Sequence, residues 1–292
     1  MKPPVFEYTA VGSVDEAVAE LARHGEAAKL LAGGQSLIPL LNMRLAAPGR
    51  LIDLNRVGPL AYIAAREGGV AIGAMTRQRA VETSAVVAAR VPLLADALPW
   101  VGHFQIRNRG TIGGSLSHAD PAAELPAVAV CLDARFTVRG PAGARILEAG
   151  EFFRTYLTTA LGPTELLTEV WFPATPPGAG SAWVEFARRH GDYALAGVGA
   201  VVTLDGARIR EARLALTGVG DTPVRAREAE ALLAAEPLTP TLVVEAAAAV
   251  RRAIDPGGDI HATPEYRRHL AGVLAGRAIM LAAARAKGAD GR

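Results

Sequence analysis

The sequence has little cysteine, few aromatic residues and almost no net charge. Its single cysteine, Cys131, excludes a disulfide framework and any all-cysteine iron–sulfur or zinc site within this chain. The 31 Lys and Arg residues nearly balance the 29 Asp and Glu residues, and the arginines form no block, which argues against nucleic acid as a main partner. The six histidines show no pair at metal-ligand spacing on one helix face, so no metal site is expected.

Long hydrophobic runs and signatures of nucleophilic catalysis are also missing. The longest uncharged apolar stretch, residues 194–204, has about half the length that a membrane helix requires and is typical of a buried strand. The first eight residues lack the apolar region of a signal peptide. No Ser/His/Asp or Cys/His arrangement and no Gly-x-Ser-x-Gly motif is present. We therefore expect a cytoplasmic protein with no membrane insertion.

The length of 292 residues predicts two domains of α+β class. Residues 173–180, with three prolines and two glycines, mark the expected boundary between a domain at 1–175 and a domain at 176–292. The first domain divides into subdomains at about 1–56 and 57–175, and Asp120 is expected to cap a helix over 122–132. The second is expected to hold three antiparallel strands and three alanine-rich helices. Composition does not decide whether these helices pack internally or form a docking face.

Two glycine turns each follow an apolar strand and precede a helix, namely residues 32–36 and residues 111–115. A glycine pair lets successive backbone N–H groups point into one concavity, and the missing Cβ lets an anion approach. A helix N-terminus behind the turn adds unpaired N–H groups. Neither turn fits the Rossmann or the P-loop fingerprint, and a glycine pair after a strand is usually only a turn. From spacing alone, a diphosphate site and a plain turn both stay open.

The residues of these two turns resemble the signatures of a known family. Ala-Gly-Gly-Gln-Ser-Leu-Ile-Pro at 32–39 and Thr-Ile-Gly-Gly-Ser-Leu-Ser-His-Ala-Asp-Pro-Ala-Ala-Glu-Leu-Pro at 111–126 resemble the two flavin signatures of the FAD-binding (medium) subunit of molybdenum hydroxylases, the carbon monoxide dehydrogenase and xanthine dehydrogenase group. Ile106-Arg-Asn-Arg-Gly110 and Gly191-Asp-Tyr-Ala194 are further matches. The resemblance spans nearly the whole chain. It implies a two-part FAD-binding domain (PCMH, or vanillyl-alcohol-oxidase-like), followed by a C-terminal domain of antiparallel sheet plus helical bundle.

The resemblance also implies which residues contact FAD. The two turns would enclose the diphosphate, Glu124 would hydrogen-bond sugar or ribityl hydroxyls, and Leu166 or Leu167 would pack near the flavin ring. Tyr193 would neighbour the isoalloxazine, and it is the one candidate catalytic residue. The full set is Ala32, Gly33, Gly34, Gln35, Ser36, Leu37, Ile106, Thr111, Gly113, Gly114, Ser115, His118, Asp120, Glu124, Leu166, Leu167 and Tyr193. We expect Gly33→Val or Gly114→Val to abolish FAD binding in a chain that still folds.

The sequence departs from the family pattern at two places. Ser115 stands where many members have Asn, so a shorter hydroxyl replaces an amide contact to the cofactor. Glu185 lies in a stretch where several relatives carry a lysine near the carbonyl edge of the flavin. Arg188 and Arg189 are the candidates to replace that positive charge.

The expected function is that of an electron-transfer subunit. The resemblance implies a large molybdopterin subunit and a small [2Fe–2S] subunit as partners, a dimer of such heterotrimers, and an external electron acceptor. Two alternatives stay open: an autonomous FAD-dependent oxidoreductase and a flavin-free scaffold subunit. Substrate turnover by the isolated chain favours the first alternative, and a chain that stays colourless even in its complex favours the second.

Overall fold

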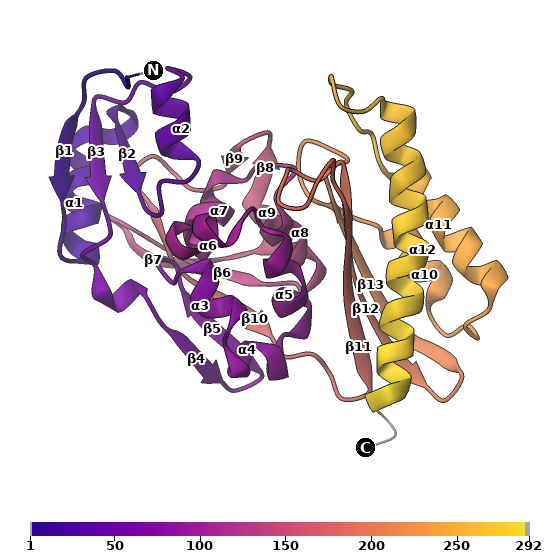
Figure 1. Cartoon of the computed structure of the whole chain (residues 1–292). Helices are drawn as coiled ribbons and strands as arrows, with labels where there is room; N and C mark the ends of the chain where they lie inside the picture. Colours follow the sequence, from indigo (N-terminus) through magenta and orange to yellow (C-terminus); the bar gives the residue numbers. More distant parts are fainter. Residues whose placement is uncertain (1, 290–292) are drawn as a thin grey trace.

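The computed structural model describes residues 2–289 and begins with a small parallel sheet (Figure 1). Its strand order is β1-β3-β2, and helices α1 and α2 are part of the same lobe. Ser13 caps α1 by accepting a hydrogen bond of 3.1 Å from the Glu16 N–H. The elements are β1 (Glu7–Ala10), α1 (Val14–His24), β2 (Ala28–Leu31), α2 (Leu37–Asn42) and β3 (Arg50–Asp53).

A five-stranded antiparallel sheet of order β4-β5-β10-β6-β7 forms the middle of the molecule. Its strands are β4 (Ile63–Arg66), β5 (Gly69–Gly73), β6 (Arg135–Gly140), β7 (Gly143–Glu148) and β10 (Leu166–Pro173). A cluster of short helices and one hairpin pack around it: α3 (Gln78–Glu82), α4 (Ala85–Arg90), α5 (Pro92–Ala97), α6 (Phe104–Arg109), α7 (Ile112–His118), α8 (Glu124–Cys131), α9 (Ala149–Phe152), β8 (Phe153–Thr155) and β9 (Thr158–Thr159). Sheet and helices share one apolar core, in which the rings of Phe136 and Phe152 stack at 4.1 Å.

A third sheet and three helices complete the chain. The antiparallel order is β11-β12-β13-β14, and the two-residue strand β14 adds a fourth strand to the three that the sequence analysis expected. One face of this sheet packs on α5 and α8 of the middle lobe, and the helices cover the other face (Figure 1). The elements are β11 (Ala179–Phe186), β12 (Ala196–Asp205), β13 (Arg208–Thr217), β14 (Val224–Arg225), α10 (Arg227–Leu233), α11 (Pro240–Ala253) and α12 (Pro264–Ala289).

The alanine-rich C-terminal helices pack internally. A Cβ on Gly180 of β11 would collide with the backbone of Ala282 and Ala286 in α12, so helix and strand touch backbone to backbone. By length and composition α12 passes as a membrane-spanning helix, yet more than half of that segment is buried in the fold. Its alanine face therefore serves as core, which answers the question that composition left open.

The segment after the second glycine turn differs from the expectation. Helix α8 begins at Glu124 rather than at residue 122, and Ala123 is its N-cap. The Asp120 carboxylate instead accepts a hydrogen bond of 2.9 Å from the Ala122 N–H, which closes a turn before the helix. Pro126 lies in the first turn of α8, where a missing N–H costs no helical hydrogen bond. Because the turn at Asp120 precedes the helix, Glu124 lies at the start of the buried helix α8.

Candidate functional site

The two glycine turns lie in direct contact. A Cβ on Gly33 would collide with the carbonyl oxygen of Arg109 and lie 2.8 Å from the Cα of Gly110. A Cβ on Gly114 would lie 3.3 Å from the Ala32 side chain. The glycine at 33 is therefore required so that one turn can pack on the other. This contact argues against the expectation that Gly33→Val leaves a chain that still folds.

The N–H groups of the first turn are available to a ligand. Within residues 2–289, the backbone N–H groups of residues 33–37 donate no hydrogen bond to any other group. The last of these groups, the Leu37 N–H, is the first of helix α2, and the Ser36 side chain does not cap it. Gly34 has φ of +75°, a left-handed conformation that favours glycine and lets the chain turn sharply here. Such a run of free donors is suited to bind an anionic group.

The second turn is built differently, because its N–H groups are already used. The Gly113 N–H donates to the Ala74 carbonyl (2.8 Å), and the Gly114 N–H donates to Thr111 Oγ1 (3.0 Å). The Ser115 N–H donates to the Thr111 carbonyl (3.2 Å). Thr111 is thus the N-cap of α7 and is itself buried, so the amides of Gly113, Gly114 and Ser115 are used within the protein while the Ser115 side chain is partly exposed. The expectation that both turns present backbone donors is wrong for the second turn.

Two polar side chains that the sequence analysis missed tie the turns together. Asn55 Nδ2 donates to the Ala32 carbonyl (3.0 Å), and Arg77 donates to Asn55 Oδ1 (2.6 Å). Arg77 also donates to the Arg109 carbonyl, next to the contact with Gly33. Asn55 lies two residues after β3 and Arg77 four residues after β5. Polar side chains just after buried strands are the sequence signal that points to them.

The junction between the middle lobe and the C-terminal sheet lies beside the second turn. Thr217 Oγ1, at the end of β13, is 2.8 Å from the Pro121 carbonyl and 2.7 Å from the Ala123 carbonyl. Glu124 and Glu185 are both buried here, at 5% and 7% exposure. Burial raises the pKa of Glu124 to about 8, with further raising contributions from Glu185 and Asp120. Burial raises the pKa of Glu185 to about 7, while the hydrogen bond from Trp183 opposes the rise.

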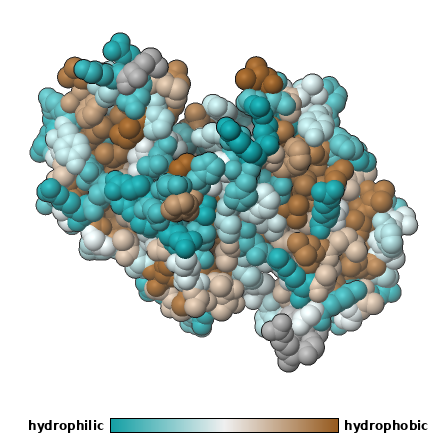
Figure 2. All heavy atoms as spheres, viewed as in Figure 1, coloured by the Kyte–Doolittle hydropathy of each residue, from teal (hydrophilic) through white to brown (hydrophobic). Residues whose placement is uncertain are grey.

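Tyr193 lies in the loop between β11 and β12 and is 66% exposed. Desolvation raises the pKa of its hydroxyl, and the charges of Asp120 and Glu124 raise it further. The loop is held in place because His190 stacks on Trp100, with ring centroids 5.4 Å apart. Figure 2 shows the surface hollowed between the N-terminal and C-terminal lobes. Tyr193 thus leaves an aromatic face free for a ligand.

The remaining predicted residues fall into two groups. Those near the turns are accessible: Gln35 is exposed, whereas Ser36, Leu37, Ile106, Ser115 and His118 are partly buried. Burial lowers the pKa of His118, and the Asp120 charge opposes this shift. Leu166 and Leu167 belong to two different core clusters, at 1% and 4% exposure, so little of either side chain is left for a flavin to contact.

Arg188 and Arg189, the two candidates to supply a positive charge at the flavin, each contact another side chain. Arg188 lies 3.0 Å from His261 Nδ1, and the exposed Arg189 pairs with Asp192 at 3.0 Å. In the stretch where the resemblance implies a lysine, Glu185 is buried and accepts the Trp183 indole N–H at 3.0 Å.

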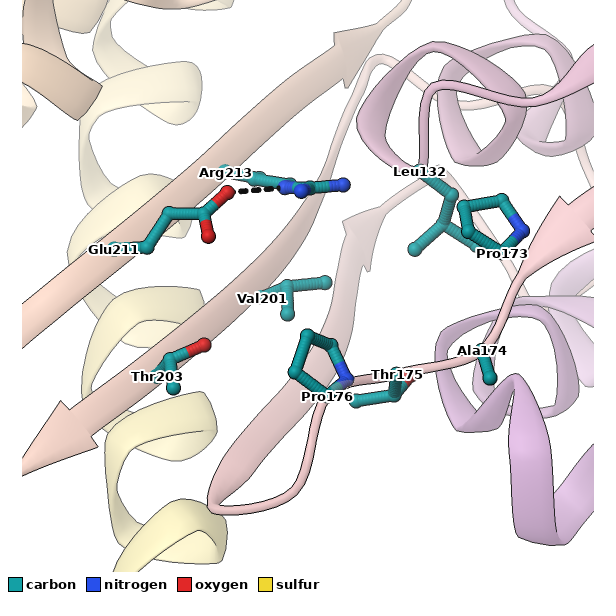
Figure 3. A pocket seen from close by; sticks show the side chains of 9 residues that line it. All are labelled: Leu132, Pro173, Ala174, Thr175, Pro176, Val201, Thr203, Glu211 and Arg213. Carbon is teal, nitrogen blue, oxygen red and sulfur yellow. Dashed lines mark hydrogen bonds and ion pairs between the residues drawn. The ribbon is translucent and has the colours of Figure 1, made fainter. Parts of the chain in front are cut away.

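The cavity of Figure 3 is too small for a cofactor. Its volume is about 10 Å³, room for about one water molecule. Arg213 and Glu211 form an ion pair of 2.6 Å on one wall, opposite the interdomain segment at Thr175 and Pro176 (Figure 3). Among residues 2–289, no group of three or more His, Cys, Asp or Glu is placed to hold a metal ion. The turns and the junction remain the strongest candidate site.

Comparison with known proteins covers the whole architecture. Residues 4–175 match the family model of the FAD binding domain in molybdopterin dehydrogenase. Residues 181–282 match that of the CO dehydrogenase flavoprotein C-terminal domain. The chain is 42% identical over 288 residues to the 6-hydroxypseudooxynicotine dehydrogenase complex subunit alpha of Paenarthrobacter nicotinovorans, covering 98% of this chain and 97% of that one.

Two further relatives are also similar over nearly the whole chain. The carbon monoxide dehydrogenase medium chain of Afipia carboxidovorans is 39% identical, with 98% of this chain and 100% of that one covered. A solved carbon monoxide dehydrogenase structure from Hydrogenophaga pseudoflava superposes with a TM-score of 0.96 at 41% identity, covering 98% of this chain and 99% of that one. These matches confirm the two-domain fold and the family that the glycine turns predicted. The chain belongs to the FAD-binding subunits of molybdopterin-dependent dehydrogenases, the carbon monoxide dehydrogenase and xanthine dehydrogenase group.

Proposed function

We propose that this chain holds the FAD diphosphate on the open N–H groups of residues 33–37. The observation that carries the proposal is this run of donors, packed against the second signature turn in a chain of the FAD-binding family. The residues fit the cofactor, because a doubly charged diphosphate needs several donors in one place and each such bond contributes roughly 1.5–3 kcal/mol. The hydroxyls of Ser36, Thr111 and Ser115 are the further donors that this proposal includes.

The rest of the cofactor would extend toward the domain junction. We assign Glu124 to the sugar or ribityl hydroxyls and Tyr193 to the flavin ring, with Ile106, His118 and Asp120 along the way. The remaining assigned residues are Ala32, Gln35, Leu37, Gly113 and Gly114, whereas the burial of Leu166 and Leu167 in the core argues against their predicted contact with the flavin ring. The burial of Glu124 and the exposure of Tyr193 support this direction. When bound, FAD accepts and releases one or two electrons, and the protein sets its position and the surrounding charge.

The function that follows is electron transfer within a complex. Relatives include a medium chain of carbon monoxide dehydrogenase and a subunit of the 6-hydroxypseudooxynicotine dehydrogenase complex. By analogy, a small [2Fe–2S] subunit would supply electrons, a large molybdopterin subunit would oxidise the substrate, and an external acceptor would take the electrons. A dimer of such heterotrimers in the cytoplasm, and a domain division at 1–175 and 176–292, belong to the same proposal.

A rapid-mixing experiment tests this function. The chain loaded with FAD is mixed under anaerobic conditions with its chemically reduced [2Fe–2S] partner, and flavin absorbance is followed. Loss of the oxidised flavin bands, and their recovery on addition of an acceptor, is the expected result. A chain that binds FAD but exchanges no electrons with the partner contradicts the proposal. Substrate turnover by the isolated chain would instead support an autonomous oxidoreductase.

A further inference from the structure

Arg267, near the start of α12, is a buried arginine whose side chain reaches the β11–β12 loop, residues 187–195. It is only 8% exposed, although arginine is rarely buried unless its charge is paired. Nη1 donates to the Leu195 carbonyl at 2.7 Å and to the Gly218 carbonyl at 3.1 Å. Nη2 donates to the Asp259 carboxylate at 2.7 Å. One side chain therefore connects three segments that lie apart in the sequence.

Tyr193 belongs to the β11–β12 loop, and this loop is anchored on both sides of it. Before the tyrosine, a Cβ on Gly191 would lie 2.5 Å from a ring nitrogen of His103, so the loop backbone packs directly on the middle lobe. After the tyrosine, the Leu195 carbonyl accepts the hydrogen bond from Arg267. The backbone of Tyr193 thus lies two residues from an anchor in each direction.

The second carbonyl that Arg267 binds leads to the other side of the proposed site. Gly218 follows β13, and its N–H donates to the Pro121 carbonyl at 2.8 Å, within the segment 120–124 that we assign to the cofactor. A Cβ on Gly218 would lie 2.9 Å from the Ala194 carbonyl oxygen, so this glycine also packs against the β11–β12 loop. The guanidinium therefore joins the loop to the segment 120–124.

The chemistry of the guanidinium suits it to hold backbone groups in place. Its donors lie in one plane at fixed angles, and hydrogen bonds from a charged donor are stronger than neutral ones. The Asp259 carboxylate holds the other side of the guanidinium, and it also accepts the N–H groups of His261 (2.8 Å) and Ala262 (2.9 Å). The arginine is thus fixed by the segment before α12 and in turn fixes the β11–β12 loop.

We infer that Arg267 is a positioning residue that holds the β11–β12 loop against the segment 120–124 and so orients the ring of Tyr193 toward the flavin. The inference rests on the proposed function for the place of Tyr193 beside the flavin. Arg267 acts through the loop and not by contact with the cofactor. Its loss should therefore change the reactivity of the flavin while the diphosphate stays bound at residues 33–37.

Hydrogen exchange of the whole chain without FAD tests the contact itself. The Leu195 N–H donates to the Phe186 carbonyl at 2.9 Å, so its exchange rate reports how often the loop opens. Arg267→Gln should speed this exchange about tenfold or more, because the carbonyl of the same residue loses its charged donor. Equal exchange in wild type and Arg267→Gln overturns the inference.

Arg285→Gln is the matched control for that measurement. Arg285 lies near the other end of α12 and likewise donates to one carbonyl and one carboxylate, those of Ser181 and Asp96. The variant should leave the exchange of the Leu195 amide unchanged. A rise equal to that in Arg267→Gln would show a general loss of stability and would overturn the inference.

The rate at which oxygen oxidises the reduced flavin separates a positioning role from a merely structural one. In the FAD-loaded chain, Arg267→Gln and Tyr193→Ala should each change this rate by about threefold or more, and the double variant should match Tyr193→Ala alone. Additive changes overturn the inference. An unchanged rate in Tyr193→Ala refutes the proposed place of this tyrosine beside the flavin, whereas faster exchange in Arg267→Gln would still support the anchoring of the loop.

Asp259→Asn keeps the inference testable if Arg267→Gln does not fold. The carboxylate of Asp259 is half-exposed, and the amide keeps an oxygen for the N–H groups of His261 and Ala262. Only the charge opposite Arg267 is lost, so exchange of the Leu195 amide should rise by about threefold. Wild-type exchange at this amide would overturn the inference.

Discussion

The two glycine turns look alike in the sequence and differ in the structure. Both follow a strand, contain a glycine pair and precede a helix, yet the first leaves the N–H groups of residues 33–37 free and the second uses its own internally. The difference comes from Thr111, which caps α7, and from Ala74, whose carbonyl accepts the Gly113 N–H. The glycine pair of the first turn thus lies among unpaired donors, whereas that of the second turn belongs to a capped helix that packs against the first turn.

Breaking the contact between the turns has the largest expected effect. Gly33→Val forces a side chain into the backbone of residues 109–110, so we expect a loss of ~3 kcal/mol or more in unfolding free energy, together with loss of FAD. This replaces the expectation of a well-folded variant. Urea unfolding and the ratio of flavin to protein absorbance measure the two effects. Gly257→Val, where a Cβ meets nothing within 4 Å, is the control, and equal stability of the two variants would contradict the packing argument.

Removing the hydrogen bonds of Arg77 that connect the two turns should have the next largest effect on stability and FAD binding. Arg77→Met deletes the hydrogen bonds to Asn55 and to the Arg109 carbonyl, and we expect a loss of ~2 kcal/mol and weaker FAD binding. Arg90→Met removes an arginine that likewise donates to two carbonyls, those of Arg66 and Gly69, away from the turns. It should keep wild-type affinity for FAD in a fluorescence titration. Equal affinities of the two variants would show that the tie does not support the site.

Thr111→Val tests whether the second turn, at residues 111–115, supports the first turn, at residues 32–36. Loss of the cap on α7 should cost ~1 kcal/mol of unfolding free energy and weaken FAD binding modestly, since the turn behind residues 33–37 loosens. Thr239→Val removes an equivalent cap on α11, where Oγ1 accepts the Leu242 N–H at 3.2 Å. We expect a similar stability loss there with FAD affinity unchanged. If both variants bind FAD equally, the second turn is not a support for the first.

The smallest effect on stability is expected for a substitution of Tyr193, in the loop between β11 and β12. Tyr193→Ala removes a side chain that is two-thirds exposed, so unfolding free energy should change by less than ~0.5 kcal/mol. FAD should stay bound by the turns, while its reduction potential or its rate of oxidation changes. Tyr266→Ala, at another exposed tyrosine on α12, is the control. Unchanged potential and rate in Tyr193→Ala would remove this residue from the site.

The sequence predicted the positions of the turns and secondary-structure elements better than the contacts that their amide groups and side chains make. Glycine pairs, the family signatures and the strand-then-helix order of the C-terminal domain are local patterns, and the structure has them at the expected places. Which amides stay free was not predictable, because the partner of Gly113 lies far along the chain at Ala74. The burial of Glu185, near the end of β11, also depends on tertiary packing, and the sequence marked this residue only as part of a stretch that departs from the resemblance.

A visible absorption spectrum shows whether the first turn binds the diphosphate of FAD. The wild-type chain and Gly33→Val, each purified alone and in complex with the partner subunits, are mixed with FAD and freed of excess. Flavin bands should persist in wild type, with FAD rather than FMN released on denaturation, and should be lost in the variant. A wild-type chain that stays colourless even in the complex, or a Gly33→Val chain that keeps its full flavin content, would refute the assignment of the first turn to the FAD diphosphate.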